Sequence, residues 1–350
     1  MTFPCAECTM DAHPRQFHKE RNMNSFLLAL ASVNSALQGL GGWLTGPMEF
    51  FSFLGSEDFF LLVLPLAYWC VDSALGLRIG VMLLLSNGLN SLFKVAMHGP
   101  RPYWVSDQVA GLASETSFGV PSGHAQIAAG VWGVAADGVK RTWARGAAAV
   151  VIFLIGLSRL YLGVHFLHDV LLGWMLGGLL LWAFIKYWDP AAARLKQFSL
   201  ANQVALAFAF SLAMILLVAL IVFLSREFVL PAQWIENATR GGGEAPNPFS
   251  LAGIVTAMGT LFGILAGAAW TASRGGFSAR GPVWKRGLRY FVGLVGVAVF
   301  YLGLKAVFPA GDDPAALVFR YVRYTLVGAW VAAGAPWAFA KLQLSDNPNR

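Results

Sequence analysis

A polytopic bundle of membrane-spanning helices, all-α in class, is the fold that the sequence predicts. Hydrophobic residues make up 57% of the 350 residues, charged residues only 12%, and the mean hydropathy is +0.60. The apolar residues gather in runs close to the ~20 residues with which a helix crosses a bilayer. Lys and Arg residues lie at the ends of these runs, so the net charge of +7 indicates membrane topology rather than a nucleic-acid partner.

Nine apolar segments form the predicted spans, although two of the early ones are short for a crossing. The nine segments are about 57–73, 77–97, 123–138, 146–163, 166–188, 202–224, 250–272, 288–307 and 317–340. Residues 26–44 give a candidate tenth span. Asn34, Gln38 and a cluster of glycines make a helix lying in the membrane interface equally compatible with that segment.

These segments divide the chain into three regions. Residues 1–56 form a polar N-terminal tail followed by the interfacial or spanning helix, and residues 57–188 form a membrane core. Residues 189–350 add about four C-terminal transmembrane helices. This last region carries none of the motifs described below and no convincing internal repeat, so the sequence assigns it no role.

The N-terminal tail contains a small group of metal-ligand residue types. Cys5, Cys8, His13 and His18 have the spacing of a small zinc knuckle in which a final His replaces Cys. Pro14 and the lack of a second such module favour a disordered tail instead. We therefore assign no metal site to this region.

The distribution of Lys and Arg predicts which membrane face carries the motifs. Counted over alternate loops, one side holds fourteen of these residues and the other holds eight, of which Lys94, Arg101 and Arg159 belong to the motif clusters. Positively charged flanks are retained on the cytoplasmic side. We therefore expect a multi-pass protein of the plasma (inner) membrane whose motif face points to the periplasm or exterior; in an organelle membrane, the same face would point to the lumen.

The first motif cluster joins Lys94, at the end of a predicted span, to Arg101. Pro100 and Pro102 prevent the intervening stretch from remaining an ordinary helix, so both cationic side chains can turn toward one pocket. A phosphate monoester carries nearly two negative charges, and a metal-free site needs fixed cations to hold it. Taken alone, either residue is better explained as a snorkelling cation at the membrane interface.

The second cluster, Pro121-Ser122-Gly123-His124, precedes the next predicted span. Ser122 resembles a helix N-cap and Gly123 permits close approach of the backbone, so free N–H groups and the helix dipole would point at an anion. His124 on the first turn can donate a proton to a leaving oxygen. The plain alternative is a capped helix start with no chemistry.

The third cluster combines Ser158-Arg159 with His165 and Asp169. Residues 165 and 169 are four apart and therefore adjacent on a helix. Asp169 can accept from one imidazole nitrogen of His165 and leave the other free to attack phosphorus. His168 lies beside Asp169 in sequence but outside such an i,i+4 contact, so we do not expect it to be catalytic.

In order and spacing, the three clusters together resemble the tripartite signature of the type 2 phosphatidic acid phosphatase superfamily. The resemblance covers residues 57–188 and leaves out the later helices. It implies an all-helical core, metal-free chemistry without a cofactor, and a phosphohistidine intermediate. It also implies that His165 is the nucleophile, Asp169 its partner and His124 the general acid. The phosphate-binding residues that it implies are Lys94, Arg101, Ser122, Gly123 and Arg159.

The predicted function is a membrane lipid phosphate or pyrophosphate phosphohydrolase acting at the non-cytoplasmic leaflet. The alternative is a phosphotransferase that passes the phosphoryl group from the same phosphohistidine to an alcohol acceptor instead of water. A transporter or scaffold is disfavoured because the motif is whole. The expected partners are the lipid phosphate substrate and membrane lipids, and a homo-oligomer is compatible with the sequence, which does not determine the lipid.

Overall fold

The computed structural model of the chain describes residues 14–345, with side chains from residue 26 onward apart from residue 241. Cys5, Cys8 and His13, together with the side chain of His18, lie outside this description. Within it, the regular elements are helices, which confirms the predicted all-α membrane bundle.

The helices follow the predicted regions in order. The first region holds α1 (Pro14–Gln38), η1 (Gly42–Leu44) and α2 (Thr45–Phe53). The core holds α3 (Glu57–Leu66), η2 (Ala67–Val71), α4 (Ser73–Met97), α5 (Pro102–Val105), α6 (Gly123–Val139), α7 (Thr142–Tyr161) and α8 (Leu167–Leu195). The remainder holds α9 (Leu200–Leu224), α10 (Ala232–Thr239), η3 (Arg240–Gly242), α11 (Ala252–Ser273), α12 (Val283–Ala298), η4 (Val299–Gly303), α13 (Leu304–Val307), α14 (Pro314–Ala329), η5 (Trp330–Gly334) and α15 (Ala335–Lys341).

The number of helices able to span a membrane differs from the nine predicted. Six helical runs in the described chain are long and apolar enough, and they match six of the nine predicted segments. The six are Ser73–Val105, Thr142–Tyr161, Leu167–Leu195, Leu200–Leu224, Ala252–Ser273 and Val283–Val307. The segments predicted at 57–73 and 123–138 form helices that are short for a crossing, since α6 has 17 residues and α3 only 10. The helical run from 314 to 341 contains Arg320 and Arg323, which lower its apolarity.

The segment predicted at 26–44 is bent rather than straight. Phe26–Gln38 and Gly42–Phe53 meet at an angle of 85°, and together they would make a seventh span, either broken or re-entrant. Gly41 adopts a φ of 115° at the bend, a conformation that favours glycine. The glycine cluster therefore turns the chain here, and α2 is brought against α7.

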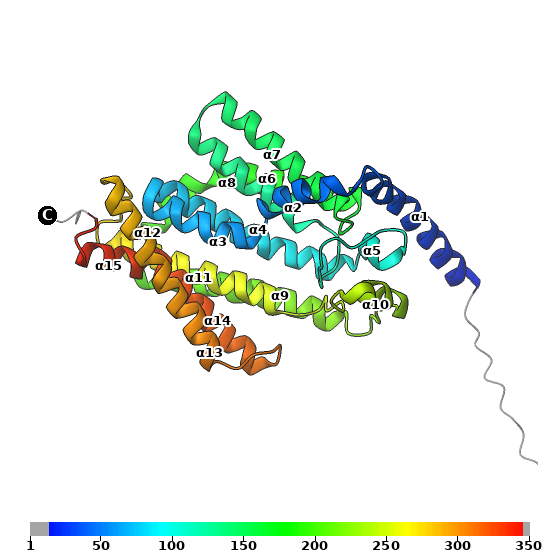
Figure 1. Cartoon of the computed structure of the whole chain (residues 1–350). Helices are drawn as coiled ribbons and strands as arrows, with labels where there is room; N and C mark the ends of the chain where they lie inside the picture. Colours follow the sequence, from blue (N-terminus) through cyan, green and yellow to red (C-terminus); the bar gives the residue numbers. More distant parts are fainter. Residues whose placement is uncertain (1–13, 346–350) are drawn as a thin grey trace, which may run out of the picture.

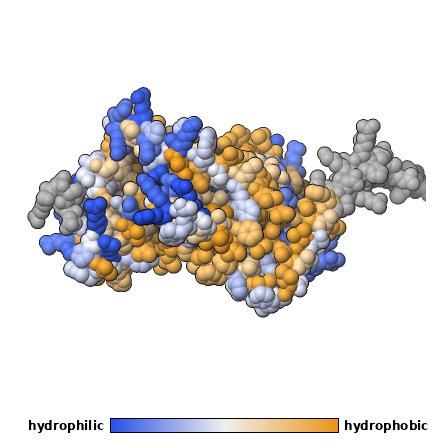
Figure 2. All heavy atoms as spheres, turned by 90° about the horizontal axis from the view of Figure 1, so that it is seen from above, coloured by the Kyte–Doolittle hydropathy of each residue, from blue (hydrophilic) through white to orange (hydrophobic). Residues whose placement is uncertain are grey.

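The long helices lie roughly side by side, so the bundle has two ends (Figure 1). The α5 and α10 helices lie at the end that also carries the connections between α4 and α6 and between α7 and α8, whereas the start of α12 and α15 lie at the other. Figure 2 shows hydrophobic residues across the middle of one face, with hydrophilic residues gathered mainly toward one end. An apolar surface of this kind fits a bilayer.

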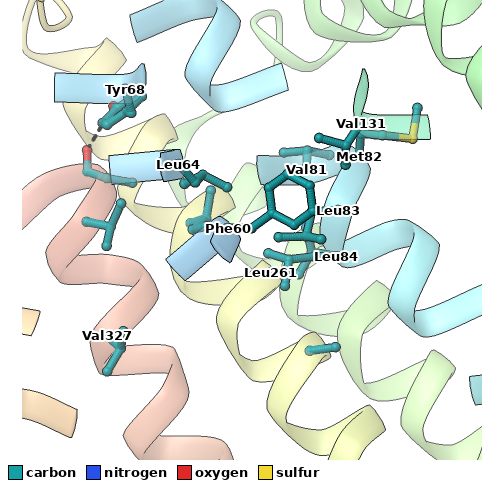
Figure 3. Packing of buried hydrophobic residues seen from close by; sticks show 14 of the residues in the cluster. Phe60, Leu64, Tyr68, Val81, Met82, Leu83, Leu84, Val131, Leu261 and Val327 are labelled. Atoms are coloured by element: carbon teal, nitrogen blue, oxygen red, sulfur yellow. Dashed lines mark hydrogen bonds between the residues drawn. The ribbon is translucent and has the colours of Figure 1, made fainter. Parts of the chain in front are cut away.

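The hydrophobic core surrounds α4, which packs against α6, α9 and α11. Figure 3 shows where the core meets the later helices: Phe60 and Leu64 of α3 lie among side chains of α4, with Leu261 of α11 and Val327 of α14 nearby. Tyr68 donates a hydrogen bond to the carbonyl of Ala332 at 3.3 Å. The later helices are therefore joined to the motif-bearing core by packing as well as by the chain.

Glycines allow close approach of two helix pairs. Gly173 and Gly177 of α8 face the backbone of α6, and Gly263 of α11 faces the backbone of α14. A Cβ atom at any of the three would overlap a carbonyl oxygen of the neighbouring helix. Small residues at such contacts are typical of membrane helix pairs. The α6 and α8 contact matters for the site because each helix begins with a predicted catalytic segment.

Candidate active site

Three connections between helices meet at one end of the bundle (Figure 1). Main-chain hydrogen bonds tie them together: Gly119 N donates to Gly99 O at 2.8 Å, Leu112 N to Leu162 O at 3.0 Å, and Ser122 N to Asp169 O at 3.0 Å. The last bond joins the second and third clusters directly, and the other two tie the loop between the first and second clusters to Gly99 and Leu162. The convergence expected from alternate membrane crossings is therefore present.

Arg101 is the most heavily bonded side chain of this end. Its guanidinium is fully buried. It donates to the carbonyls of Ser117 at 2.7 Å, Val164 at 3.0 Å and Phe118 at 3.2 Å, and to the Ser117 hydroxyl at 3.1 Å. Arg101 thus connects the loop before α6 to the loop before α8.

Glu115 bridges the guanidinium groups of Arg101 and Arg159. Its Oε2 lies 3.3 Å from Arg101 Nη2, and its Oε1 accepts a short hydrogen bond from Arg159 Nη2. Burial raises the pKa of the Glu115 carboxyl, but the charges of Arg101, Arg159 and Lys94 outweigh burial and hold that pKa well below its usual range. An ionised carboxylate therefore occupies the space between two cations assigned by the motifs to phosphate.

Hydroxyl groups hold the other predicted phosphate-binding cations. Arg159 Nη1 donates to the hydroxyl of Ser52 on α2, and Lys94 Nζ donates to the hydroxyl of Ser117 at 2.7 Å. Arg159 is buried, and its Nε has no hydrogen-bond partner among the described residues. Lys94, Arg101 and Arg159, here called the cationic group, therefore include one unused N–H donor, the Nε of Arg159.

His165 lies between a carboxylate and a guanidinium. Its Nδ1 is 3.3 Å from Asp169 Oδ2, and its Nε2 is 3.3 Å from Arg101 Nη1. Burial lowers the pKa of the imidazole to about 3, Arg101 acts in the same direction, and Asp169 opposes both. The ring is therefore neutral at neutral pH, and a proton on Nδ1 leaves the lone pair of Nε2 facing the cationic group.

The α1 helix holds the segment that carries His165. Asn34 is fully buried, and its Nδ2 donates to the carbonyls of Leu160 at 2.8 Å and His165 at 2.9 Å. Gln38, one turn later, donates to the carbonyls of Ala110 and Tyr161. The polar residues that weakened the case for a membrane span are therefore bonded to the site.

The second motif forms the start of α6 as predicted. Ser122 caps the helix by accepting from Ala125 N at 3.5 Å, and it is buried. Gly123 allows close approach of Asn90, whose Oδ1 would lie 3.0 Å from a Cβ atom at that position. His124 lines the same cavity as Glu115. Ser122 itself makes no hydrogen bond to the three cations.

A cavity of about 350 Å³ opens beside the cationic group. Lys94, Glu115, Ser117, Gly123 and His124 line it. Arg101, Arg159 and His165 are not among its lining residues, so an anion entering from the cavity meets Glu115 before it reaches the two guanidinium groups. Among the described residues, no three His, Cys, Asp or Glu side chains form a group suited to a metal ion.

His168 makes a contact that the sequence analysis did not foresee. Its Nε2 lies 3.0 Å from Asp169 Oδ1, and its ring stacks on Phe166. The side chain is 43% exposed, whereas that of His165 is buried. Asp169 therefore faces two imidazoles, and only His165 is enclosed with Arg101.

Four further residues of the site were missed by sequence reasoning, namely Asn34, Ser52, Glu115 and Ser117. The only local signal was weak, an acidic residue and a hydroxyl in the loop between the first and second motifs. Asn34 and Ser52 belong to helices more than 100 positions before their partners, and no spacing pattern links them.

A carboxylate-oriented imidazole and fixed cations at one end of an apolar helix bundle define a membrane protein with a phosphate-handling site. The chain belongs to the PAP2 superfamily. Residues 75–193 match the family model described as PAP2 superfamily, and residues 255–347 match the one described as PAP2 superfamily phosphatase, transmembrane extension. The chain is therefore a membrane phosphatase of this family.

The comparisons with individual proteins differ in how much of the chain they cover. The chain is 26% identical to glucose-6-phosphatase 3 from Homo sapiens over 360 residues, which cover 93% of this chain and 99% of that protein. It is 33% identical to phosphatidylglycerophosphatase B from Bacillus subtilis (strain 168) over 168 residues, 44% of this chain and 80% of that protein.

One solved structure is also similar, that of a transmembrane PAP2 type phosphatidylglycerolphosphate phosphatase from Bacillus subtilis. It is 30% identical and covers 47% of this chain and 93% of its own, with a TM-score of 0.38.

Proposed function

We propose that this protein is a lipid phosphate phosphohydrolase that works without a metal, through a phosphohistidine on His165. The observation that carries the proposal is the position of that imidazole. Its Nδ1 lies 3.3 Å from Asp169, and its Nε2 lies 3.3 Å from the Arg101 guanidinium. A nucleophile oriented by a carboxylate and facing fixed positive charge suits attack on a phosphate group.

In the first step, the lone pair of His165 Nε2 forms a bond to phosphorus, and the bond from phosphorus to the alkoxide oxygen breaks. Asp169 accepts from Nδ1–H and stabilises the positive charge that develops on the ring. Arg101, Arg159 and Lys94 bind the phosphoryl oxygens, and the free Nε of Arg159 supplies an additional donor. His124 donates a proton to the leaving alkoxide.

In the second step, water replaces the alcohol. His124, now neutral, removes a proton from the water as its oxygen attacks phosphorus, and the N–P bond breaks to release inorganic phosphate and neutral His165. The atoms balance without a cofactor. Before the first step, the substrate phosphate has to displace Glu115 from Arg101 and Arg159, because that carboxylate bridges both.

The membrane orientation follows the charge distribution of the loops. Counted over the predicted loops, fourteen Lys and Arg residues fall on the side opposite the motifs, against five on the motif side outside the clusters. This bias supports an active site that faces away from the cytoplasm. Labelling of a single cysteine introduced at the exposed Glu244 by a membrane-impermeant reagent on intact cells tests it, and an unlabelled Glu244→Cys protein contradicts the orientation.

Trapping of the phosphoenzyme tests the mechanism. Purified protein in detergent is mixed with radiolabelled lipid phosphate and quenched, and we expect a labelled protein whose label is lost in acid and kept in alkali. His165→Ala should abolish both label and turnover while the protein stays folded. His168→Gln is the matched control and should retain the label. Loss of label in His168→Gln together with its retention in His165→Ala would reject the assignment.

Phosphotransfer to an alcohol remains the alternative outcome for the same intermediate. Adding an alcohol acceptor and measuring both inorganic phosphate and phosphorylated acceptor separates the two reactions. Stoichiometric phosphate release in the presence of the acceptor supports hydrolysis.

A second candidate substrate class is a water-soluble sugar phosphate. The relative that aligns over 93% of this chain is named as a glucose-6-phosphatase, whereas the lipid phosphatase described above aligns over 44%. Phosphate release from glucose 6-phosphate and from a panel of lipid phosphates, measured side by side, decides between the two classes.

A further inference from the structure

The cavity of about 350 Å³ beside Lys94 and His124, here called the phosphate cavity, adjoins a second cavity of about 310 Å³. The two cavities share Glu57, Asn87 and Gly253 among their lining residues. They therefore meet where α3, α4 and α11 come together. Each volume lies near the lower end of the ~300–1,000 Å³ typical of ligand pockets.

The second cavity, here called the tail chamber, is lined mainly by hydrophobic side chains. Phe60 and Leu64 come from α3, Leu84 from α4, Ile264 from α11, and Val327 from α14. Figure 3 shows Phe60, Leu64 and Leu84 grouped together, with Val327 on the neighbouring helix. Two of these elements, α11 and α14, belong to the C-terminal region to which the sequence assigned no role. The core alone therefore does not enclose the chamber.

The polar and apolar cavities have complementary chemistry. The phosphate cavity carries Lys94, Ser117 and His124. Most of the tail chamber's lining is aliphatic or aromatic, and its polar members include Thr256, Thr260, Glu57, Asp58 and Asn87. A molecule that extends through both places a phosphate against the cations and a hydrocarbon chain among α3, α4, α11 and α14. A sugar phosphate has no apolar part to place in the chamber.

We propose that the tail chamber binds the hydrocarbon chain of the substrate, so that the C-terminal helices form the chain-binding half of the active site. This proposal rests on the proposed function as a lipid phosphatase. A bilayer is as apolar as the chamber, so the chamber gains little affinity from hydrophobic transfer. Its contribution is to position the phosphate relative to His165 by fixing the chain, and misplacement by about 1 Å can cost on the order of 10²-fold in rate.

The chamber can be filled without touching the phosphate cavity. Thr260 lines the chamber and not the phosphate cavity, and its hydroxyl bonds only within α11, to the carbonyl of Thr256 at 2.8 Å among the described residues. Thr260→Phe therefore adds a ring to the chamber. Gly178→Phe on α8 is the matched control, because no atom lies within 4 Å of a Cβ atom added there.

The test compares a long-chain alkyl phosphate in mixed micelles with p-nitrophenyl phosphate, which has no chain. In the wild-type protein we expect a higher kcat/KM for the long-chain ester. Thr260→Phe should lower kcat/KM for this ester by roughly tenfold or more and leave that for p-nitrophenyl phosphate nearly unchanged. Gly178→Phe should change neither. If Thr260→Phe does not fold, Thr256→Leu narrows the same chamber more mildly, and we expect the same selective loss.

Three results overturn the proposal in distinguishable ways. An unchanged kcat/KM for the long-chain ester in a folded Thr260→Phe protein shows that the chain lies elsewhere, for instance in bulk lipid. An equal loss with both substrates shows damage to the phosphate cavity and no chain site. A wild-type protein that hydrolyses p-nitrophenyl phosphate and glucose 6-phosphate but no long-chain ester rejects the proposed lipid function itself.

Discussion

Replacement of Glu115 by Gln is the perturbation that the site geometry constrains most closely. The carboxylate bridges Arg101 and Arg159 and lines the phosphate cavity, so it competes with substrate for both guanidinium groups. Gln keeps the shape and an acceptor oxygen but removes the charge. We expect the variant to be less stable without phosphate and to bind phosphate more tightly.

The expected loss of stability in Glu115→Gln depends on how far the ion pairs of Glu115 with Arg101 and Arg159 are exposed to solvent. Removing one partner of a fully buried ion pair costs about 3–5 kcal/mol. Glu115 is 24% exposed and Gln retains a hydrogen bond, so we expect a loss of about 2 kcal/mol in the free energy of unfolding. Phosphate binding to the wild-type protein includes the same cost of displacing the carboxylate. This cost is absent in Glu115→Gln. A difference of about 2 kcal/mol corresponds to roughly 30-fold tighter binding of phosphate by the variant.

Two assays measure the two effects. Thermal unfolding of the detergent-solubilised protein, followed by tryptophan fluorescence, should show a lower midpoint for Glu115→Gln without phosphate. Saturating phosphate should restore much of the lost stability of the variant, since a ligand at about 100 times its dissociation constant adds about 2.7 kcal/mol to the free energy of unfolding. The inhibition constant of inorganic phosphate, measured as product inhibition of turnover, should be lower for Glu115→Gln than for the wild-type protein. Glu227→Gln, at an exposed glutamate, is the matched control.

Inhibition of Glu115→Gln by phosphate that is as weak as in the wild-type protein would refute this reasoning. It would mean that phosphate binds without displacing the carboxylate. A midpoint equal to that of the wild-type protein in phosphate-free buffer would likewise show that the bridge contributes nothing to stability.

The remaining predictions concern the groups around His165. Asp169→Asn should lower kcat by at least ~10²-fold in a phosphate-release assay, because the imidazole loses its orienting acceptor. Asn34→Ala should lower kcat more than it raises KM, since the carbonyl of His165 loses a donor that lies outside the phosphate cavity. The imidazole of His165 titrates near 6.5 in the unfolded chain and near 3 in the folded one, so the unfolded chain binds more protons between these values. Stability should therefore fall as pH falls below about 6.5, and His165→Gln should flatten that slope in unfolding measurements. Treatment with EDTA should leave turnover unchanged, and an obligatory divalent ion would contradict the mechanism.

Features of this protein that depend on a few neighbouring residues could be predicted from the sequence. The apolar runs were recognised because a helix that crosses a bilayer needs a length and composition visible in one window, and all nine segments are indeed helical. Three of the nine fall short of the length and apolarity of a span, because α3 and α6 are short and the run from 314 to 341 contains Arg320 and Arg323. The sequence predicts that these segments are helical, but how deeply each one enters the membrane depends on the helices that pack against it.

Residue type, order and spacing were enough to determine the helical membrane class and the three motif clusters, since capping, prolines and i,i+4 pairs act over a few positions. Only the tertiary structure revealed Glu115 between the guanidinium groups, the bond of Asn34 to a carbonyl 131 positions later, and the chamber between α3, α4, α11 and α14. These features arise where helices distant in sequence pack together, and the packing depends on shapes and small residues that no local pattern encodes.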